Sequence, residues 1–267
     1  QVEKGKSQFV GPEIKGKELG VLGLGAVGSK VANAAVSMEM EVLGYDPFIS
    51  VEAAWSLSTA VKRAKDLKTI FDKCDYITLH LPLTDDTKET INKEAFNQMK
   101  KGVRIINLSR GELVNNEDMK AALEEGRVST YVTDFPNEKL AHLNGVITLP
   151  HLGASTPESE DNSAIMVALE TKDFLENGNI KNSVNYPNCE MGVCTTQHRL
   201  TIAHRNIPKM LGNISSVLSE QGANIANMIN KSRGNYAYTM IDAEEKITIE
   251  NVKKIEDIDG VLKVRVL

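Results

Sequence analysis

Hydrophobic positions in the first two thirds of this chain form short runs that alternate with amphipathic segments. The runs are nearly continuous, as in strands buried on both faces of a parallel sheet, and they predict strands over 19–22, 42–45, 76–81, 103–108, 128–133 and 145–149. The segments between them predict helices after residue 28 and over 66–73, 87–99, 116–126 and 157–177, whereas 58–64 is ambiguous with a short strand at its end. This alternation predicts an α/β fold with a doubly wound parallel sheet.

The pattern changes after a polar stretch over 181–193 that contains proline and glycine, which we interpret as a linker. Beyond it the sequence predicts strands over 200–204, 223–230, 236–241 and 261–267, with helices over 208–220 and 249–258. The order βαββαβ indicates a small α+β domain with an antiparallel sheet and helices on one face. We therefore expect a linker over 1–15, a first domain over 16–180 and a second over 194–267.

A glycine turn follows the first predicted strand and leads into the first helix. Gly23, Gly25 and Gly28 form a G-x-G-x-x-G pattern, and the second strand ends at Asp46. Gly23 permits a tight turn, Gly25 lets a pyrophosphate approach the backbone, and Gly28 allows close packing of helix on strand. A carboxylate at position 46 suits an adenosine ribose and repels a 2′-phosphate. The motif predicts a Rossmann domain that binds NAD rather than NADP, the alternative being a turn that binds nothing.

Composition narrows the class of protein. The 267 residues are 41% hydrophobic and 25% charged, which is typical of a soluble globular protein of two domains. A net charge of −5 argues against a nucleic acid or membrane surface as the main partner. We see no transmembrane segment and no signal peptide, and the three cysteines lack metal-ligand spacing, so we expect no metal and a reducing cytoplasm.

Polar residues recur where the predicted strands end, which is where open α/β sheets bind ligands. Those strand ends carry Gly25, Asp46, His80, Arg110, Asp134 and His151. Arg110 can hold a substrate carboxylate and polarise a neighbouring carbonyl. His151 can move a hydroxyl proton, with Glu138 as the carboxylate that orients it. The alternatives are a surface arginine, a histidine satisfied within a loop and a solvated glutamate.

Several segments resemble the NAD-dependent D-2-hydroxyacid dehydrogenases: GLGAVGSKVA, DYITLHLPL, VRIINLSRGELVN and LPHLGAST. The resemblance implies that Arg110 binds and polarises the 2-hydroxy acid, that His151 is the general acid/base, and that Glu138 pairs with His151. It also implies that Asp134 holds the nicotinamide carboxamide, although the segment from Asp134 to Glu138 is one residue shorter than in the family. The remaining implied cofactor contacts are Ala26, Val27, His80, Pro82, Ser109 and Gly153.

The C-terminal unit resembles an ACT domain, a module that binds amino acids. Serine-inhibited members of the family use a His-x-Asn-x-Pro-Gly turn, to which His204 and Asn206 correspond, and a further asparagine, to which Asn224 corresponds. Lys209 stands where those members have glycine. The resemblance implies L-serine as an effector; the alternative is that Asn206 and Pro208 only begin a helix.

With this tail, the resemblance is to family members that oxidise 3-phosphoglycerate with NAD in the first step of L-serine biosynthesis. We expect that substrate and, because the last predicted strand is suited to pair with a neighbour, a homo-oligomer. The N-terminal part of the family's substrate domain is not recognisable, so we expect this stretch alone to bind NAD but turn over poorly. The alternatives are a glycerate, lactate or formate type of 2-hydroxyacid dehydrogenase, or an NAD-binding sensor without catalysis.

Overall fold

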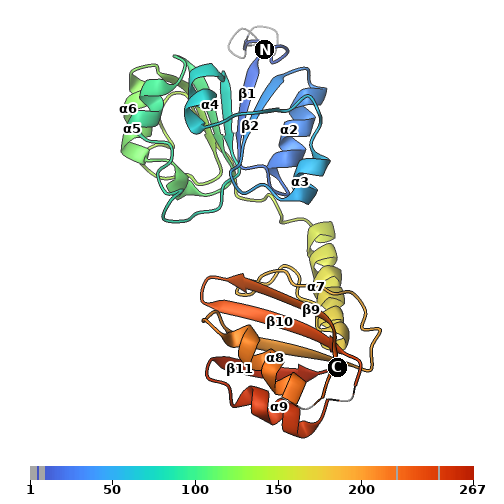
Figure 1. Ribbon diagram of the computed structural model, residues 1–267. Coiled ribbons are helices and arrows are strands. Elements are labelled where there is room, and N and C mark those ends of the chain that lie inside the picture. Colours follow the sequence, from blue (N-terminus) through green and yellow to red (C-terminus); the bar gives the residue numbers. More distant parts are fainter. Residues whose placement is uncertain (1–4, 6–9, 221, 246) are drawn as a thin grey trace. The chain divides into compact units, whose positions relative to one another are not determined.

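A computed structural model describes residues 5, 10–220, 222–245 and 247–267 (Figure 1). Part of the predicted N-terminal linker, residues 1–4 and 6–9, lies outside the described residues. The chain divides into two compact units, Gln1–Gly153 and Ala154–Leu267. Each unit has its own sheet and its own hydrophobic core, so each is described by itself.

The first unit is built on a parallel sheet of seven strands. The strands are β1 (Glu18–Leu22), β2 (Glu41–Tyr45), β3 (Lys62–Arg63), β4 (Tyr76–Leu79), β5 (Val103–Asn107), β6 (Val128–Thr133) and β7 (Val146–Thr148). Their order in the sheet is β3-β2-β1-β4-β5-β6-β7, and every neighbouring pair is parallel. The direction of winding reverses between β1 and β4, which places a ligand-binding crevice at their carboxyl ends. The predicted doubly wound parallel sheet is confirmed.

Helices pack on this sheet and complete its core. They are α2 (Gly28–Ser37), α3 (Val51–Ser56), α4 (Leu67–Lys73), α5 (Lys93–Gln98) and α6 (Asn116–Glu124), with a 3₁₀ turn at Gly111–Leu113. The sequence missed α3, which begins where the Ser50 side chain accepts a hydrogen bond from the Ala53 amide. The helix predicted over 87–99 is shorter because Asn92 caps its start and Ile91 bridges to Val114.

The second unit begins with the long helix α7 (Pro157–Asn177), whose bounds are those predicted. An antiparallel sheet follows, built from β8 (His198–Arg205), β9 (Ile225–Arg233), β10 (Tyr236–Ala243) and β11 (Val261–Val266) in the order β11-β8-β10-β9. Helices α8 (Met210–Glu220) and α9 (Ile249–Glu256) pack on one face of it, and the segment after α7 packs on the other (Figure 1). The element order βαββαβ is as predicted.

The domain boundary differs from the predicted one, because α7 clusters with the antiparallel sheet and the chain divides before it. Two arginines of that sheet hold the last turn of α7. Arg265 donates to the carbonyls of Phe174 and Leu175, at 3.2 and 3.0 Å. Arg199, which is fully buried, donates to the Asn177 carbonyl at 2.9 Å while its guanidinium pairs with Asp242. The last carbonyls of a helix have no partner within the helix and form the negative end of its dipole. Arginine donors at these carbonyls therefore favour the attachment of α7 to the sheet.

Over the residues that the structure describes, no helix is both long and apolar enough to span a membrane.

Candidate functional site

The glycine turn after β1 combines two crowded positions with one open position. A Cβ atom at Gly28 would lie 1.9 Å from the Gly23 carbonyl oxygen. Gly23 itself has φ +90°, and a Cβ atom there would lie 2.5 Å from the His80 carbonyl oxygen. A Cβ at Gly25 would meet no atom within 4 Å. Gly23 and Gly28 are therefore needed by the fold, whereas the space at Gly25 is free for a ligand. Ala26 and Val27 are exposed beside it and lead into the first turn of α2.

Asp46, at the end of β2, holds the glycine turn in place. Its Oδ2 accepts the Leu24 amide at 2.9 Å and its Oδ1 accepts the Phe48 amide at 2.8 Å. The carboxylate also lines a cavity of about 300 Å³ that includes Lys62 and Arg63. Sequence reasoning missed these two cations, which make up the short strand β3 beside β2. Asp46 lies at the carboxyl edge of β2, where sheets of this kind bind ligands.

The ends of β4 and β5 are tied together beside this turn. Ser109 Oγ donates to the Leu81 carbonyl at 2.8 Å, and the Pro82 carbonyl accepts from Thr87 Oγ1 at 2.6 Å. His80 Nε2 lies 3.0 Å from Thr78 Oγ1, and burial lowers the pKa of His80. The candidate cofactor residues His80, Pro82 and Ser109 therefore lie at one edge of the sheet.

Arg110 directly follows Ser109, and its side chain is exposed. Its Nη1 donates to the Ser109 carbonyl at 2.6 Å. Its own carbonyl accepts from Nδ2 of Asn107 at 2.8 Å, and Asn107 is fully buried. Sequence reasoning missed Asn107; the available signal was a polar residue directly after the apolar pair Ile105 and Ile106, at the end of the strand. The exposed guanidinium of Arg110 at this edge can hold a carboxylate through two parallel hydrogen bonds.

The carboxylate at His151 is Asp134 and not Glu138, which corrects the predicted pairing. Asp134 Oδ2 lies 2.8 Å from His151 Nδ1, and the Phe135 ring lies 4.7 Å from the imidazole, centroid to centroid. Asp134 directly follows β6 and is only 8% exposed. Glu138 is exposed because Asn137 Oδ1 accepts the amides of residues 139 and 140, which forms a turn that carries Glu138 into a shallow depression lined by α6.

These residues fit a nicotinamide dinucleotide. The open position at Gly25 lets phosphates approach the amides at the start of α2, a geometry suited to anions. The Asp46 carboxylate lies at the end of the neighbouring strand. Asp134 Oδ1 is buried and has no hydrogen-bond partner among the described residues, so it can accept from an amide donor of a ligand. Gly153, where a Cβ would meet no atom within 4 Å, closes this unit.

The three candidate serine residues do not come together within one chain. His204 is buried, with its Nε2 2.8 Å from Thr239 Oγ1. Asn206 Nδ2 donates to the Gly234 carbonyl, at the hairpin before β10, whereas Asn224 Nδ2 donates to Glu244, just after β10. Two points about nine strand residues apart are separated by about 30 Å. Asn206 and Asn224 thus lie at opposite ends of the antiparallel sheet.

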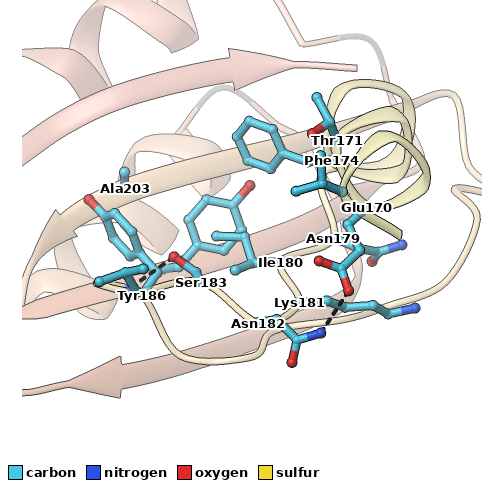
Figure 2. A pocket seen from close by; sticks show the side chains of 13 residues that line it. Glu170, Thr171, Phe174, Asn179, Ile180, Lys181, Asn182, Ser183, Tyr186 and Ala203 are labelled. Carbon is cyan, nitrogen blue, oxygen red and sulfur yellow. Dashed lines mark hydrogen bonds between the residues drawn. The ribbon is translucent and has the colours of Figure 1, made fainter. Parts of the chain in front are cut away.

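A separate cavity of about 430 Å³ lies in the second unit and was not predicted. Figure 2 shows it between the last turns of α7, the segment that follows α7, and the sheet. Its floor is apolar and includes Phe174, Ile180 and Tyr186. At its mouth Asn182 Nδ2 donates to Glu170 Oε1 at 2.7 Å. None of the candidate catalytic residues lines this cavity.

Two curated proteins are similar to nearly the whole of this chain. The chain is 31% identical to D-3-phosphoglycerate dehydrogenase of Haemophilus influenzae, over 98% of this chain and 65% of that protein. It is 32% identical to the enzyme of the same name from Dictyostelium discoideum, over 96% and 64%. The chain thus spans slightly less than two thirds of the length of these curated relatives.

A solved structure, NAD⁺-bound 3-phosphoglycerate dehydrogenase of Entamoeba histolytica, is similar with a TM-score of 0.57 and 32% identity, covering 66% of this chain and 57% of that one. Residues 1–153 match the family described as D-isomer specific 2-hydroxyacid dehydrogenase, NAD binding domain. The chain belongs to the D-isomer specific 2-hydroxyacid dehydrogenases, and its first unit is the NAD-binding domain of that family.

Proposed function

We propose that the protein oxidises 3-phosphoglycerate to 3-phosphohydroxypyruvate with NAD, the first step of L-serine biosynthesis. The observation that carries the chemistry is the His151–Asp134 pair at the same sheet edge as Arg110 and the glycine turn. The choice of substrate is supported by the curated relatives, which are named for it. 3-Phosphoglycerate carries a hydroxyl on the carbon next to its carboxylate, which is the group that the proposed site would oxidise.

Arg110 and His151 divide the work on the 2-hydroxy acid. The exposed guanidinium of Arg110 binds the carboxylate and stabilises negative charge on the neighbouring oxygen. Asp134 accepts a hydrogen bond from the Nδ1–H group of His151, which leaves Nε2 as the acceptor for the hydroxyl proton of the substrate. The NAD held at this edge would supply the acceptor for the hydride of the hydroxyl-bearing carbon. Reduction of the 2-oxo acid runs through the same groups, with His151 as the acid.

Residues of the first unit would hold the cofactor at several points. The backbone at Gly25, Ala26 and Val27 would bind the pyrophosphate, and Asp46 the adenosine ribose. Around the nicotinamide, Asp134 would accept from the carboxamide through its unpaired Oδ1. The other cofactor contacts that we propose are His80, Pro82, Ser109, His151 and Gly153.

The second unit would act as an ACT-like regulatory domain that assembles with a second copy. Asn206 and Asn224 lie at opposite ends of one sheet, so a serine site that uses both needs Asn224 from another chain. A homo-oligomer that forms through an edge of the sheet meets this requirement. L-serine at millimolar concentration should then raise the thermal midpoint of unfolding. No shift would indicate that this unit only mediates assembly.

The assay that tests the proposed reaction follows NADH absorbance in the 267-residue chain. We expect NADH to form faster with 3-phosphoglycerate than with D-glycerate, D-lactate or formate, even where the rate is low. A faster rate with one of the other acids would assign a different substrate. NADH binding without turnover of any acid would indicate a sensor.

A further inference from the structure

Asn107, the last residue of β5, lies beneath the turn that carries Arg110. Its side chain is fully buried. Oδ1 accepts the amide of Ser109 at 3.2 Å, and Nδ2 donates to the carbonyl of Arg110 at 2.8 Å. The side chain thus bonds both peptide groups that flank the Ser109–Arg110 pair. Such a side chain fixes a turn more firmly than exposed backbone contacts do, since leaving either buried group unpaired is costly.

The same turn is held from the two neighbouring strands. Ser109 Oγ donates to the Leu81 carbonyl, after β4, at 2.8 Å. On the other side the hydroxyl of the buried Tyr131, in β6, lies 3.5 Å from Asn107 Nδ2. Because β4 and β6 both pair with β5, these contacts tie the turn to the rigid centre of the sheet. Arg110 itself is exposed, so its position depends on the backbone beneath it.

Contacts beyond the turn lead to His151. A Cβ atom at Gly111 would lie 3.2 Å from Phe135 Cβ, so the backbone after Arg110 passes directly against Phe135. The Phe135 ring in turn lies 4.7 Å from the imidazole of His151. If the turn at Ser109–Arg110 moved, it would either clash with Phe135 or lose contact with it, and Phe135 packs against His151, the proposed acid/base.

We propose that Asn107 is a positioning residue that sets the place of Arg110 for binding the substrate carboxylate. This inference rests on the proposed function, in which Arg110 binds that carboxylate. Small displacements of a substrate-holding group are costly, and side chains that lock such groups are part of a working site. Asn107 does not touch substrate; it acts only through the backbone of residues 109 and 110.

The test compares Asn107→Ala and Asn107→Asp with the wild-type chain, using NADH and 3-phosphohydroxypyruvate. Both variants lose the donor to the Arg110 carbonyl. We expect the KM for the 2-oxo acid to rise about tenfold in Asn107→Asp, which loses one buried hydrogen bond, and at least as much in Asn107→Ala, which loses two. The Kd of NADH should change less than twofold in both. Ser129→Ala is a control that removes a side-chain hydrogen bond elsewhere on the same strand pair: the exposed Ser129 hydroxyl donates to the Gly102 carbonyl at 2.8 Å, at the opposite edge of the β5–β6 pair.

An unchanged KM in both variants, or equal losses in KM and NADH affinity, would overturn the proposal. Hydrogen exchange of the Ser109 amide gives a readout that needs no turnover. This exchange should be faster in Asn107→Ala than in Ser129→Ala, and equal rates would overturn the proposal. If the wild-type chain turns over no 2-oxo acid, the proposed function fails, and the exchange of Ser109 still tests whether Asn107 holds the turn.

Discussion

Asp134 Oδ2 lies 2.8 Å from Nδ1 of His151, while the other oxygen of the same carboxylate is buried and unpaired among the described residues. One carboxylate at the end of β6 can therefore serve two purposes. In the proposed function, one oxygen orients the imidazole and the other accepts a hydrogen bond from the cofactor. This arrangement makes the loop after β6 more central to the site than the sequence indicated.

Replacing this carboxylate should therefore affect turnover far more than replacing Glu138. We expect Asp134→Asn to lower kcat for 2-oxo acid reduction by about 100-fold or more, because an asparagine can present the wrong hydrogen-bonding group to the imidazole. Glu138→Gln should stay within about threefold. Steady-state rates with NADH, together with circular dichroism to verify folding, measure both. A larger loss in Glu138→Gln would restore the pairing that the sequence predicted.

The choice between NAD and NADP should depend on the charge of Asp46. In Asp46→Ala the repulsion of a 2′-phosphate is lost, and Lys62 and Arg63 in the same cavity can attract that phosphate. The ratio of NADPH to NADH affinity should rise about tenfold or more. Asp46→Asn keeps an acceptor for a loop amide and removes the charge, so it separates the two effects. An unchanged ratio in both variants would exclude Asp46 from this role.

Lys209 should be a site where glycine stabilises the second unit. Its φ of +68° lies in the left-handed region, directly before α8. A side chain there costs about 1–2 kcal/mol, partly offset by the greater freedom of glycine in the unfolded chain. Lys209→Gly should raise the free energy of unfolding by about 1 kcal/mol. Lys209→Ala, which keeps the Cβ, should give no gain; equal effects of both would assign the change to the lysine side chain.

Stability should fall in mild acid because of His80. Burial lowers the pKa of His80 in the folded protein, so the unfolded chain takes up a proton near pH 6.5 that the folded chain does not bind. The free energy of unfolding therefore decreases as the pH falls from about 6.5 to the lowered pKa of the folded protein. His80→Gln should flatten the dependence of the thermal midpoint on pH between 7 and 5, whereas the exposed His142→Gln should leave it unchanged. The same slope in all three proteins would contradict this origin.

Much of the first unit follows from local sequence patterns. The apolar runs located the long parallel strands, and the rule that ligands bind at strand ends located His80, Arg110 and Asp134. Partners that depend on three-dimensional contacts were not accessible in this way. Asp134 rather than Glu138 pairs with His151, because a turn at Asn137 redirects the chain. The attachment of α7 depends on Arg199, whose full burial requires its partner Asp242.

Binding of NADH to a Gly25 variant tests the central claim most directly. A Cβ atom at Gly25 would meet no atom within 4 Å, so Gly25→Val should fold with an unchanged thermal midpoint while filling the space proposed for the pyrophosphate. Gly212→Ala, at an open position in α8, is the control. Calorimetric titration should show NADH binding to the wild-type chain and to Gly212→Ala, and at least tenfold weaker binding to Gly25→Val. Equal NADH affinity in all three chains would contradict the account.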